Sequence, residues 1–339
     1  MKTEKNPHMY WLDAAKGIGI ILVVIGHSER GLVSSGIAPE SWKSGIDFYL
    51  YTFHMPLFML LAGVNAPKSM HAGRYNFLKR KIATVVWPYF LWSIIFGILI
   101  ALLGSVANGR GSWHDIFLIG WRPIGPFWFL YSLFIYSLIF SIATSRALIL
   151  AAISIVAFVF SQEIKEDTLI HGTLHFFVFY MMGVLISKKM VDFKGNPTWL
   201  TVLAMGTIWL CASAAIGNIS NYNYFSSWAL PSAILGSATV IALGMKVKGL
   251  FQLALCALGR ASMPIYVMHV LGTAGTRIIL HRSGLTDSPI LHLLIGTAIG
   301  IAAPYGVYIV TKKLGWLAAL GFGQSRILNT VQMSAHANH

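Results

Sequence analysis

LDAAKGIGIILVVIGHSE, residues 12 to 29, is apolar enough to begin a membrane helix, yet it carries Asp13, Lys16 and His27. Ionisable side chains turned toward lipid are costly, and inside a membrane they usually mark a pathway or a site. We therefore predict that this segment is a membrane helix whose charged side faces protein or water. Other segments of the sequence must then pack against that side of the helix.

The composition indicates an integral membrane protein. The chain has 339 residues, of which 56% are hydrophobic and 11% are charged, against roughly 25% charged in an average soluble domain. Apolar runs of about 20 residues, long enough to cross a hydrocarbon core roughly 30 Å thick, recur along the whole length. We predict an all-α fold, a polytopic transmembrane helical bundle of about ten helices. It forms one domain over residues 1–339, with a core at 10–315 and a short cytoplasmic tail at 316–339. The expected spans are 12–32, 46–66, 82–104, 127–144, 146–161, 169–187, 198–217, 226–245, 261–281 and 290–311.

The basic residues predict the orientation. An even number of spans places both termini on one side, and 17 of the 25 Lys and Arg residues then fall on that side. Since cytoplasmic loops are enriched in Lys and Arg, both termini are predicted to be cytoplasmic. The net charge of +14 is explained by this face and its contact with membrane lipid, so no nucleic-acid partner is expected.

The first span aligns its three ionisable residues. Lys16 lies about one turn after Asp13, and His27 follows eleven residues later, within about 20° of the same direction and about 16 Å further along the axis. One stripe of this kind favours a functional role. The alternative is an Asp13–Lys16 ion pair at the interface and a hydrogen-bonded His27 inside the bundle.

Histidines recur in later spans. His54, two residues before Pro56, is expected near the depth of His27, either for chemistry or for a structural hydrogen bond at a proline kink. Tyr266 and His269 lie one turn apart and could equally form a hydrogen bond between helices. His171 and His175 have a metal-ligand spacing, but no third ligand accompanies them, so no metal site is expected.

Two further motifs are ambiguous. Lys79, Arg80 and Lys81 open the third span; such clusters usually set topology or touch anionic lipid, and could equally hold the phosphates of a soluble donor. Trp128 begins the fourth span, either as an interfacial aromatic residue or as the wall of an acceptor groove.

Taken together, these motifs resemble the membrane acyltransferase 3 superfamily, the bacterial sugar O-acyltransferases. The family's first helix has Leu-Asp, a short gap, Arg, ten residues and His, similar to LDAAKGIGIILVVIGHS. FHMPLFMLLAG, FWFL and LGRASMPIYVMH are similar to later family motifs in the same order. Lys16 stands where the family usually has Arg, and Ala62 stands where it often has Ser. The Glu that many members carry after the Trp-Phe-Leu stretch is absent from this sequence. The chain is most similar to the short, fucose O-acetylase-like branch without a periplasmic hydrolase-like domain.

The resemblance implies a multi-pass protein of the bacterial inner membrane that moves an acetyl group from cytoplasmic acetyl-CoA to a hydroxyl of an extracytoplasmic glycan or lipid-linked sugar. His27 is the expected general base, since a neutral imidazole can take the hydroxyl proton. Acetyl-CoA is expected as a substrate, with no permanently bound cofactor. The remaining assignments are donor binding by Asp13, Lys16, Lys79, Arg80, Tyr266 and His269, and acceptor binding or catalytic support by His54, Trp128 and His175.

Two other functions fit the residues. A transporter or flippase for a glycan precursor would also need intramembrane charges, although no inverted halves are recognisable. A non-catalytic scaffold in a polysaccharide-synthesis complex would not need His27. The sequence leaves the acceptor open among envelope glycans, exopolysaccharide and lipid-linked intermediates.

Overall fold

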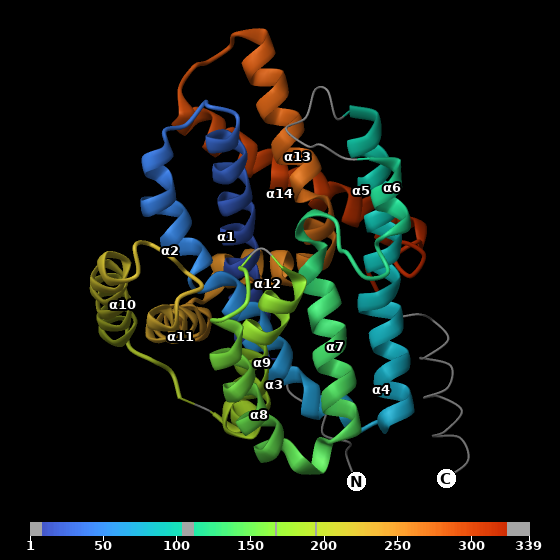
Figure 1. The fold of residues 1–339 in the computed structure, drawn as a ribbon, viewed down its shortest axis with the longest axis vertical. Coiled ribbons are helices and arrows are strands. Elements are labelled where there is room, and N and C mark those ends of the chain that lie inside the picture. Colours follow the sequence, from blue (N-terminus) through green and yellow to red (C-terminus); the bar gives the residue numbers. More distant parts are fainter. Residues whose placement is uncertain (1–8, 104–111, 167, 194, 324–339) are drawn as a thin grey trace.

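A computed structural model describes residues 9–103, 112–166, 168–193 and 195–323, and these residues contain helices and no β-strand. Ten helical segments among them are long and apolar enough to cross a membrane, which confirms the predicted bundle (Figure 1). They are Tyr10–Ser34, Glu40–Met70, Arg74–Leu102, Gly125–Ile142, Thr144–Ser161, Leu169–Asp192, Trp199–Ile219, Ser227–Lys246, Ser262–Ser283 and Pro289–Leu314.

Several spans are built from more than one helix. The second span contains a π-helical turn at Lys43–Asp47, then α2 and α3; the third contains α4, a second π-helical turn at Ile82–Val86, and α5. The α-helices are α1 Tyr10–Ser34, α2 Phe48–Tyr51, α3 His54–Met70, α4 Arg74–Lys81, α5 Trp87–Leu103, α6 Trp113–Phe117, α7 Trp128–Ile142, α8 Ala147–Ser161, α9 Leu169–Asp192, α10 Trp199–Ile219, α11 Leu230–Lys246, α12 Gly249–Arg260, α13 Ser262–Ser283 and α14 Pro289–Leu314.

Close backbone approaches hold the centre of the bundle together. α3 and α9 pack through Gly63 and Gly183: a Cβ atom at Gly63 would collide with the carbonyl of Tyr180, and one at Gly183 with the carbonyl of Leu60. In lipid, where the hydrophobic effect does not drive helices together, such small-residue contacts allow the van der Waals packing that does. This pair fixes α3 and therefore the position of His54 at its first residue.

Helix α12 is absent from the predicted spans. It has 12 residues, too few to cross a bilayer, and it packs along the first half of α1. Gly17 of α1 lies against the backbone of Leu255, and Gly259 of α12 against the backbone of Asp13. An ion pair of 3.8 Å between Arg260 Nη1 and Asp13 Oδ2 joins the same two elements. α12 thus fixes the start of α1, where Lys16 lies.

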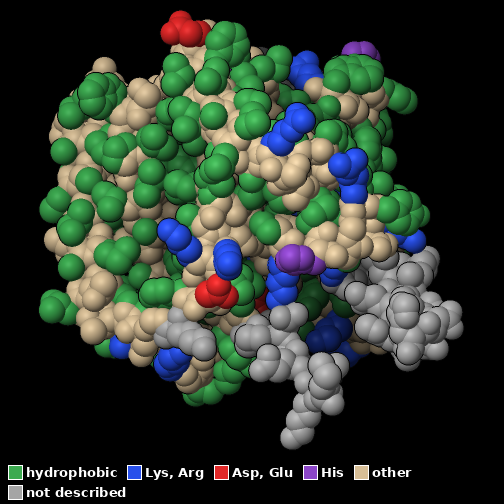
Figure 2. Space-filling model, turned by 90° about the horizontal axis from the view of Figure 1, so that it is seen from below, with side chains coloured by type: hydrophobic (Ala, Val, Ile, Leu, Met, Phe, Trp, Pro, Cys, Tyr) green, Lys and Arg blue, Asp and Glu red, His purple; other side chains and the backbone are tan. Residues whose placement is uncertain are grey.

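The outside of the bundle is apolar. Large hydrophobic side chains such as Leu148, Leu200, Phe251 and Leu294 are exposed, as expected for a surface that faces lipid. Figure 2 shows one face on which hydrophobic side chains predominate, with single Lys and Arg side chains scattered among them. The protein is therefore a multi-pass membrane protein.

The end of the chain after α14 packs back onto the bundle as far as it is described. The indole of Trp87 donates to the carbonyl of Ala319 at 2.7 Å, and that of Trp92 to the carbonyl of Leu320 at 3.1 Å. Phe322 stacks on Trp92 with ring centroids 5.5 Å apart. Of the predicted tail, residues 316–323 therefore cover α5, and residues 324–339 lie outside the described part of the chain.

Candidate active site

Three histidines from three helices meet near one tyrosine. The rings of His27 in α1 and His269 in α13 have centroids 4.8 Å apart. Tyr51 of α2 lies 6.0 Å from His27 and 4.5 Å from His54, the first residue of α3. We call His27, Tyr51, His54 and His269 the histidine cluster. The expectation that His54 lies near the depth of His27 agrees with this arrangement, whereas the contact with His269 was not foreseen.

Hydrogen bonds define the protonation of two of these rings. His54 Nδ1 lies 2.6 Å from the carbonyl oxygen of Leu50, and His269 Nδ1 lies 2.6 Å from that of Tyr266. A carbonyl only accepts, so we assign the proton to Nδ1 in both rings, which leaves a lone pair on each Nε2. Both Nε2 atoms are buried and have no hydrogen-bond partner among the described residues.

His27 differs from its two neighbours in exposure. His54 and His269 are completely buried, whereas His27 keeps part of its surface accessible. The ring of Tyr51 packs against α1 beside His27 because Gly26 has no side chain: a Cβ there would come within 2.8 Å of the ring. His27 is therefore the histidine of the cluster that a substrate can reach.

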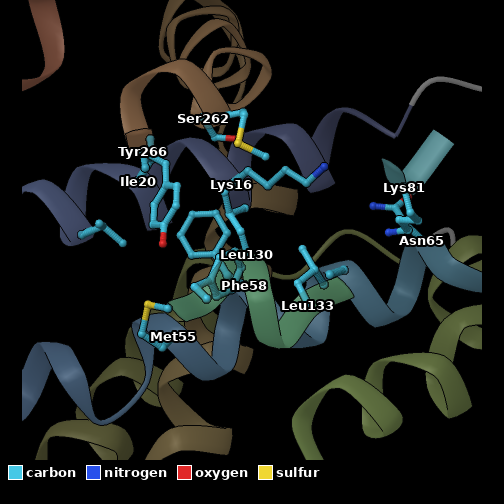
Figure 3. A pocket seen from close by; sticks show the side chains of 14 residues that line it. Lys16, Ile20, Met55, Phe58, Asn65, Lys81, Leu130, Leu133, Ser262 and Tyr266 are labelled. Atoms are coloured by element: carbon cyan, nitrogen blue, oxygen red, sulfur yellow. The ribbon is translucent and has the colours of Figure 1, made fainter. Parts of the chain in front are cut away.

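One cavity approaches the cluster from the end of the bundle at which α1 begins, here called the inner end. This inner cavity has a volume of about 220 Å³. It reaches Val23, Met55 and Tyr266, which lie within about one turn of His27, His54 and His269 respectively. Its walls are otherwise largely apolar, with Ile20, Phe58, Leu130 and Leu133 among them (Figure 3).

The mouth of the inner cavity is cationic. Figure 3 shows Asn65 and Lys81 together at one end, with Lys16 between them and the apolar end. The residues that line the cavity include these two lysines and no Asp or Glu. Two ammonium groups that share a cavity with no carboxylate in its wall favour an anionic group there.

The predicted donor-binding residues divide into two groups. Lys16 and Tyr266 line the inner cavity; the Tyr266 hydroxyl donates to the carbonyl of Pro126, which holds the ring in the wall. Asp13 is instead within ion-pair distance of Arg260. Lys79 and Arg80 lie on α4 directly before Lys81 but outside the lining, so Lys81 is the basic residue of that run that sequence reasoning did not select.

Trp128 and His175 belong to a separate aromatic cluster. Trp128 stacks on Phe176 with centroids 5.3 Å apart, and His175 packs against Phe158 at 4.8 Å and Phe225 at 5.3 Å. His175 also lies 3.5 Å from the side-chain amide of Gln162. Both predicted residues are thus surrounded by aromatic side chains of α8, α9 and the loop after α10, and their ring contacts do not include the histidine cluster.

A second cavity, of about 740 Å³, opens at the end of the bundle where α1 ends. This outer cavity is lined by the last turns of α1, the 40–47 segment, Glu166 and the 221–224 loop. Arg30 forms a bidentate ion pair with Asp47, Nε to Oδ1 at 2.5 Å and Nη2 to Oδ2 at 3.0 Å, and its guanidinium lies 3.2 Å above the ring of Tyr51. Sequence reasoning selected none of these outer residues.

Tyr224 connects the outer cavity to the cluster, with its ring 5.6 Å from that of Tyr51. Burial raises the pKa of the Tyr224 hydroxyl above its ordinary value, so this phenol stays neutral. Tyr51 therefore contacts both Arg30 and Tyr224, which line the outer cavity, and His27 and His54 of the histidine cluster.

The side chains that could bind a metal ion do not form a cluster in the described part of the chain. Within the described ranges, no group of three or more His, Cys, Asp or Glu side chains lies close enough to hold a metal ion. His171 and His175, the pair with ligand spacing, stack on one another with ring centroids 5.5 Å apart. The arrangement that remains is a partly accessible histidine between two cavities.

Comparisons with known proteins identify the family of the chain. Residues 9–309 match a family model described as an acyltransferase domain. The chain is similar to nodulation protein NolL of Mesorhizobium japonicum, with 25% identity over 193 residues, which is 55% of this chain and 50% of that protein. The chain therefore spans about half the length of this curated relative. No solved structure matches.

Proposed function

Because the chain belongs to the membrane acyltransferase family, we propose that it is a transmembrane O-acyltransferase that moves an acetyl group from cytoplasmic acetyl-CoA to a sugar hydroxyl on the other side of the membrane. The observation that carries the proposal is the position of His27. It lies one turn beyond Val23 of the inner cavity and beside Tyr51, whose ring packs against Arg30 and Tyr224 in the wall of the outer cavity. A donor and an acceptor could therefore approach one imidazole from opposite ends.

The inner cavity suits the donor. Lys16 and Lys81 would bind phosphate oxygens or polar groups of the arm, and the apolar walls would surround the arm and the acyl group. A volume of about 220 Å³ is smaller than the ~300–1,000 Å³ of sites for whole drug-sized ligands. The nucleotide would therefore stay at the mouth, within reach of Lys79 and Arg80, while only the arm enters. Asp13 would contribute to donor binding by holding Arg260 and the start of α1.

The reaction at His27 follows from acyl-transfer chemistry. A lone pair of the imidazole takes the proton of the acceptor hydroxyl. At the same time, the hydroxyl oxygen forms a bond to the carbonyl carbon of the thioester. The carbon–sulfur bond then breaks, and the imidazolium returns the proton to the departing thiolate. The products are the sugar ester and free coenzyme A, and His27 is neutral again.

Tyr51 is placed to assist the tetrahedral intermediate. Its hydroxyl is buried and has no hydrogen-bond partner among the described residues, and its ring faces His27. A phenol with a free proton can donate to the oxyanion that develops on the carbonyl oxygen. His54 and His269, whose Nε2 atoms can only accept, would position Tyr51 and His27. His269 also follows Tyr266 by one turn, at the thioester end of the donor site.

The surroundings of the reaction are part of the same proposal. With both termini cytoplasmic, the inner cavity opens to the cytoplasm, where acetyl-CoA is found, and the protein resides in the bacterial inner membrane. The acceptor is a glycan or a lipid-linked sugar, and partners in a polysaccharide-synthesis complex would deliver it. Trp128 and His175 would act on the acceptor through Phe225, which follows Tyr224 in the outer loop.

Purified protein in lipid nanodiscs tests the reaction without transport. Incubation with acetyl-CoA labelled in the acetyl group should give labelled sugar ester or slow release of labelled acetate, and both should be lost in His27→Ala. His281→Ala, an exposed histidine at the other end of α13 from the inner cavity, is the matched control and should retain both. Equal activity of the His27 variant and the wild type would refute the assignment of the base.

The same assay separates the other functions. A transporter or flippase, or a scaffold, would bind no acetyl-CoA and release no labelled acetate in a nanodisc. In cells, His27→Ala should abolish O-acetylation of the envelope glycan, measured by NMR of the purified polysaccharide, while the amount of membrane-inserted protein stays the same.

A further inference from the structure

The outer cavity contains a buried acidic side chain that no N–H or hydroxyl group of the described residues reaches. Glu29 has no exposed surface, and neither of its oxygens accepts a hydrogen bond from an N–H or hydroxyl group of a described residue. Its side-chain contact is with another acid, the carboxyl group of Asp47. It lines the cavity, one turn or less beyond His27 on α1. A buried charge without donors is costly, so a site that keeps one needs hydrogen-bond donors from another source.

The other charges of the cavity are already paired. Arg30 donates to Asp47 through Nε and Nη2, and Lys43 forms an ion pair with Glu40. Glu166 accepts a hydrogen bond of 2.5 Å from the side-chain amide of Asn223. The two cations are thus matched by two carboxylates, Asp47 and Glu40. Glu166 adds a further negative charge, and Glu29 adds another acidic group that can share a proton with Asp47. The cavity is therefore net negative.

The shape and the remaining walls suit a sugar. A volume of about 740 Å³ lies within the ~300–1,000 Å³ typical of ligand pockets. Tyr222 and Tyr224 supply rings that combine an apolar face with a polar tip, and Asn221 and Asn223 supply amides. Carboxylates only accept hydrogen bonds, whereas sugar hydroxyl and amine groups donate them.

We propose that the outer cavity is the acceptor subsite and that it binds a sugar without negative charge, neutral or amino-bearing, whose hydroxyl or amine protons bond to Glu29. Uronate, sulfated and phosphorylated sugars are disfavoured because they would bring a further negative charge into a cavity whose acidic side chains outnumber its basic ones. The word acceptor in this inference rests on the proposed acyl transfer. The sugar would lie above Tyr51, with the reacting hydroxyl directed past its ring toward His27.

Binding of defined tetrasaccharides tests the subsite directly. The probes are maltotetraose, a glucosamine tetramer and a galacturonate tetramer, each mixed with the protein in nanodiscs and followed by saturation-transfer NMR. We expect saturation of at least one of the first two and none of the galacturonate tetramer. In Glu29→Gln and in Tyr224→Ala the binding should weaken at least tenfold, whereas Glu163→Gln, an exposed carboxylate outside the cavity, should bind as the wild type does.

Retained binding of acetyl-CoA in the Glu29 variant shows that it is folded. Binding of none of the uncharged or amino probes, a preference for galacturonate, or unaltered binding in Glu29→Gln overturns the subsite. None of these results depends on turnover. If sugar binds as expected but His27→Ala leaves acetyl transfer unchanged, the proposed reaction fails and the subsite stands.

Discussion

Replacing Lys81 by Met should weaken the binding of acetyl-CoA more than replacing either basic residue before it. Met keeps most of the length of the side chain and removes the charge. Lys81 lines the inner cavity, whereas Lys79 lies 5.9 Å from the ring of Tyr75 and, like Arg80, outside the lining. A cluster that acts only through its total charge would respond equally at all three positions.

The size of the effect follows from the hydrogen bond that the ammonium group of Lys81 would donate to the donor. A hydrogen bond to a charged partner contributes about 1.5–3 kcal/mol, and about 1.4 kcal/mol corresponds to a factor of ten in Kd. Lys81→Met should therefore raise the Kd of acetyl-CoA by about 10- to 100-fold. Lys16 and Lys81 are close enough to repel each other. Removing both should consequently cost less than the sum of the single effects, since the first substitution relieves that repulsion.

Equilibrium binding of labelled acetyl-CoA to protein in nanodiscs measures the three variants side by side. Acetyl-pantetheine, which lacks the nucleotide and its phosphates, serves as the second ligand, and its Kd should change less than threefold in Lys81→Met. An equal loss of acetyl-CoA affinity in Lys79→Met and Lys81→Met would refute the placement of Lys81 at the mouth of the inner cavity. An equal loss of affinity for acetyl-CoA and acetyl-pantetheine would refute a contact between Lys81 and phosphate.

Three further substitutions test other parts of the structure. Tyr51→Phe should lower kcat by about 100- to 1,000-fold with the Kd of acetyl-CoA unchanged, and an unchanged kcat would remove the hydroxyl from the reaction. Gly63→Ala should lower the free energy of unfolding of the purified protein by about 1–3 kcal/mol, because the added methyl group overpacks against Tyr180. Thermal unfolding measures this loss. Gly275→Ala, with open space around its Cβ position, is the control and should not destabilise. Arg30→Lys keeps the charge but loses the bidentate geometry, so the KM for the acceptor should rise about tenfold while donor binding persists.

The membrane spans could be predicted because lipid imposes length and apolarity on each of them. All ten predicted segments correspond to helical spans in the described chain. Helix α12 was missed because 12 residues are too few to give a span, and its position depends on glycine contacts with α1 that only the packed structure shows.

The site was predicted less completely than the fold. The period of one helix placed Lys16 and His27 on a common stripe, and both lie along the route from the inner mouth to the cluster. Helical periodicity carries no information about contacts between helices. It therefore did not select Lys81 over Lys79, and it did not place His269 beside His27. The outer cavity was overlooked because its walls come from three regions far apart in the sequence, residues 29–47, Glu166 and residues 221–224.

Tyr51 has an electrical consequence for the cell. Two cavities that approach one another from opposite faces of an energised membrane leave a short distance over which protons or small ions could leak. The ring of Tyr51, in contact with Arg30, His27 and His54, lies in this interval. The acyl group, bonded first to the thioester sulfur and then to the sugar oxygen, would cross from one cavity to the other. The Tyr51 ring would meanwhile keep the path closed to ions. Growth of cells that carry Tyr51→Ala would then depend on how well they tolerate a dissipated membrane potential.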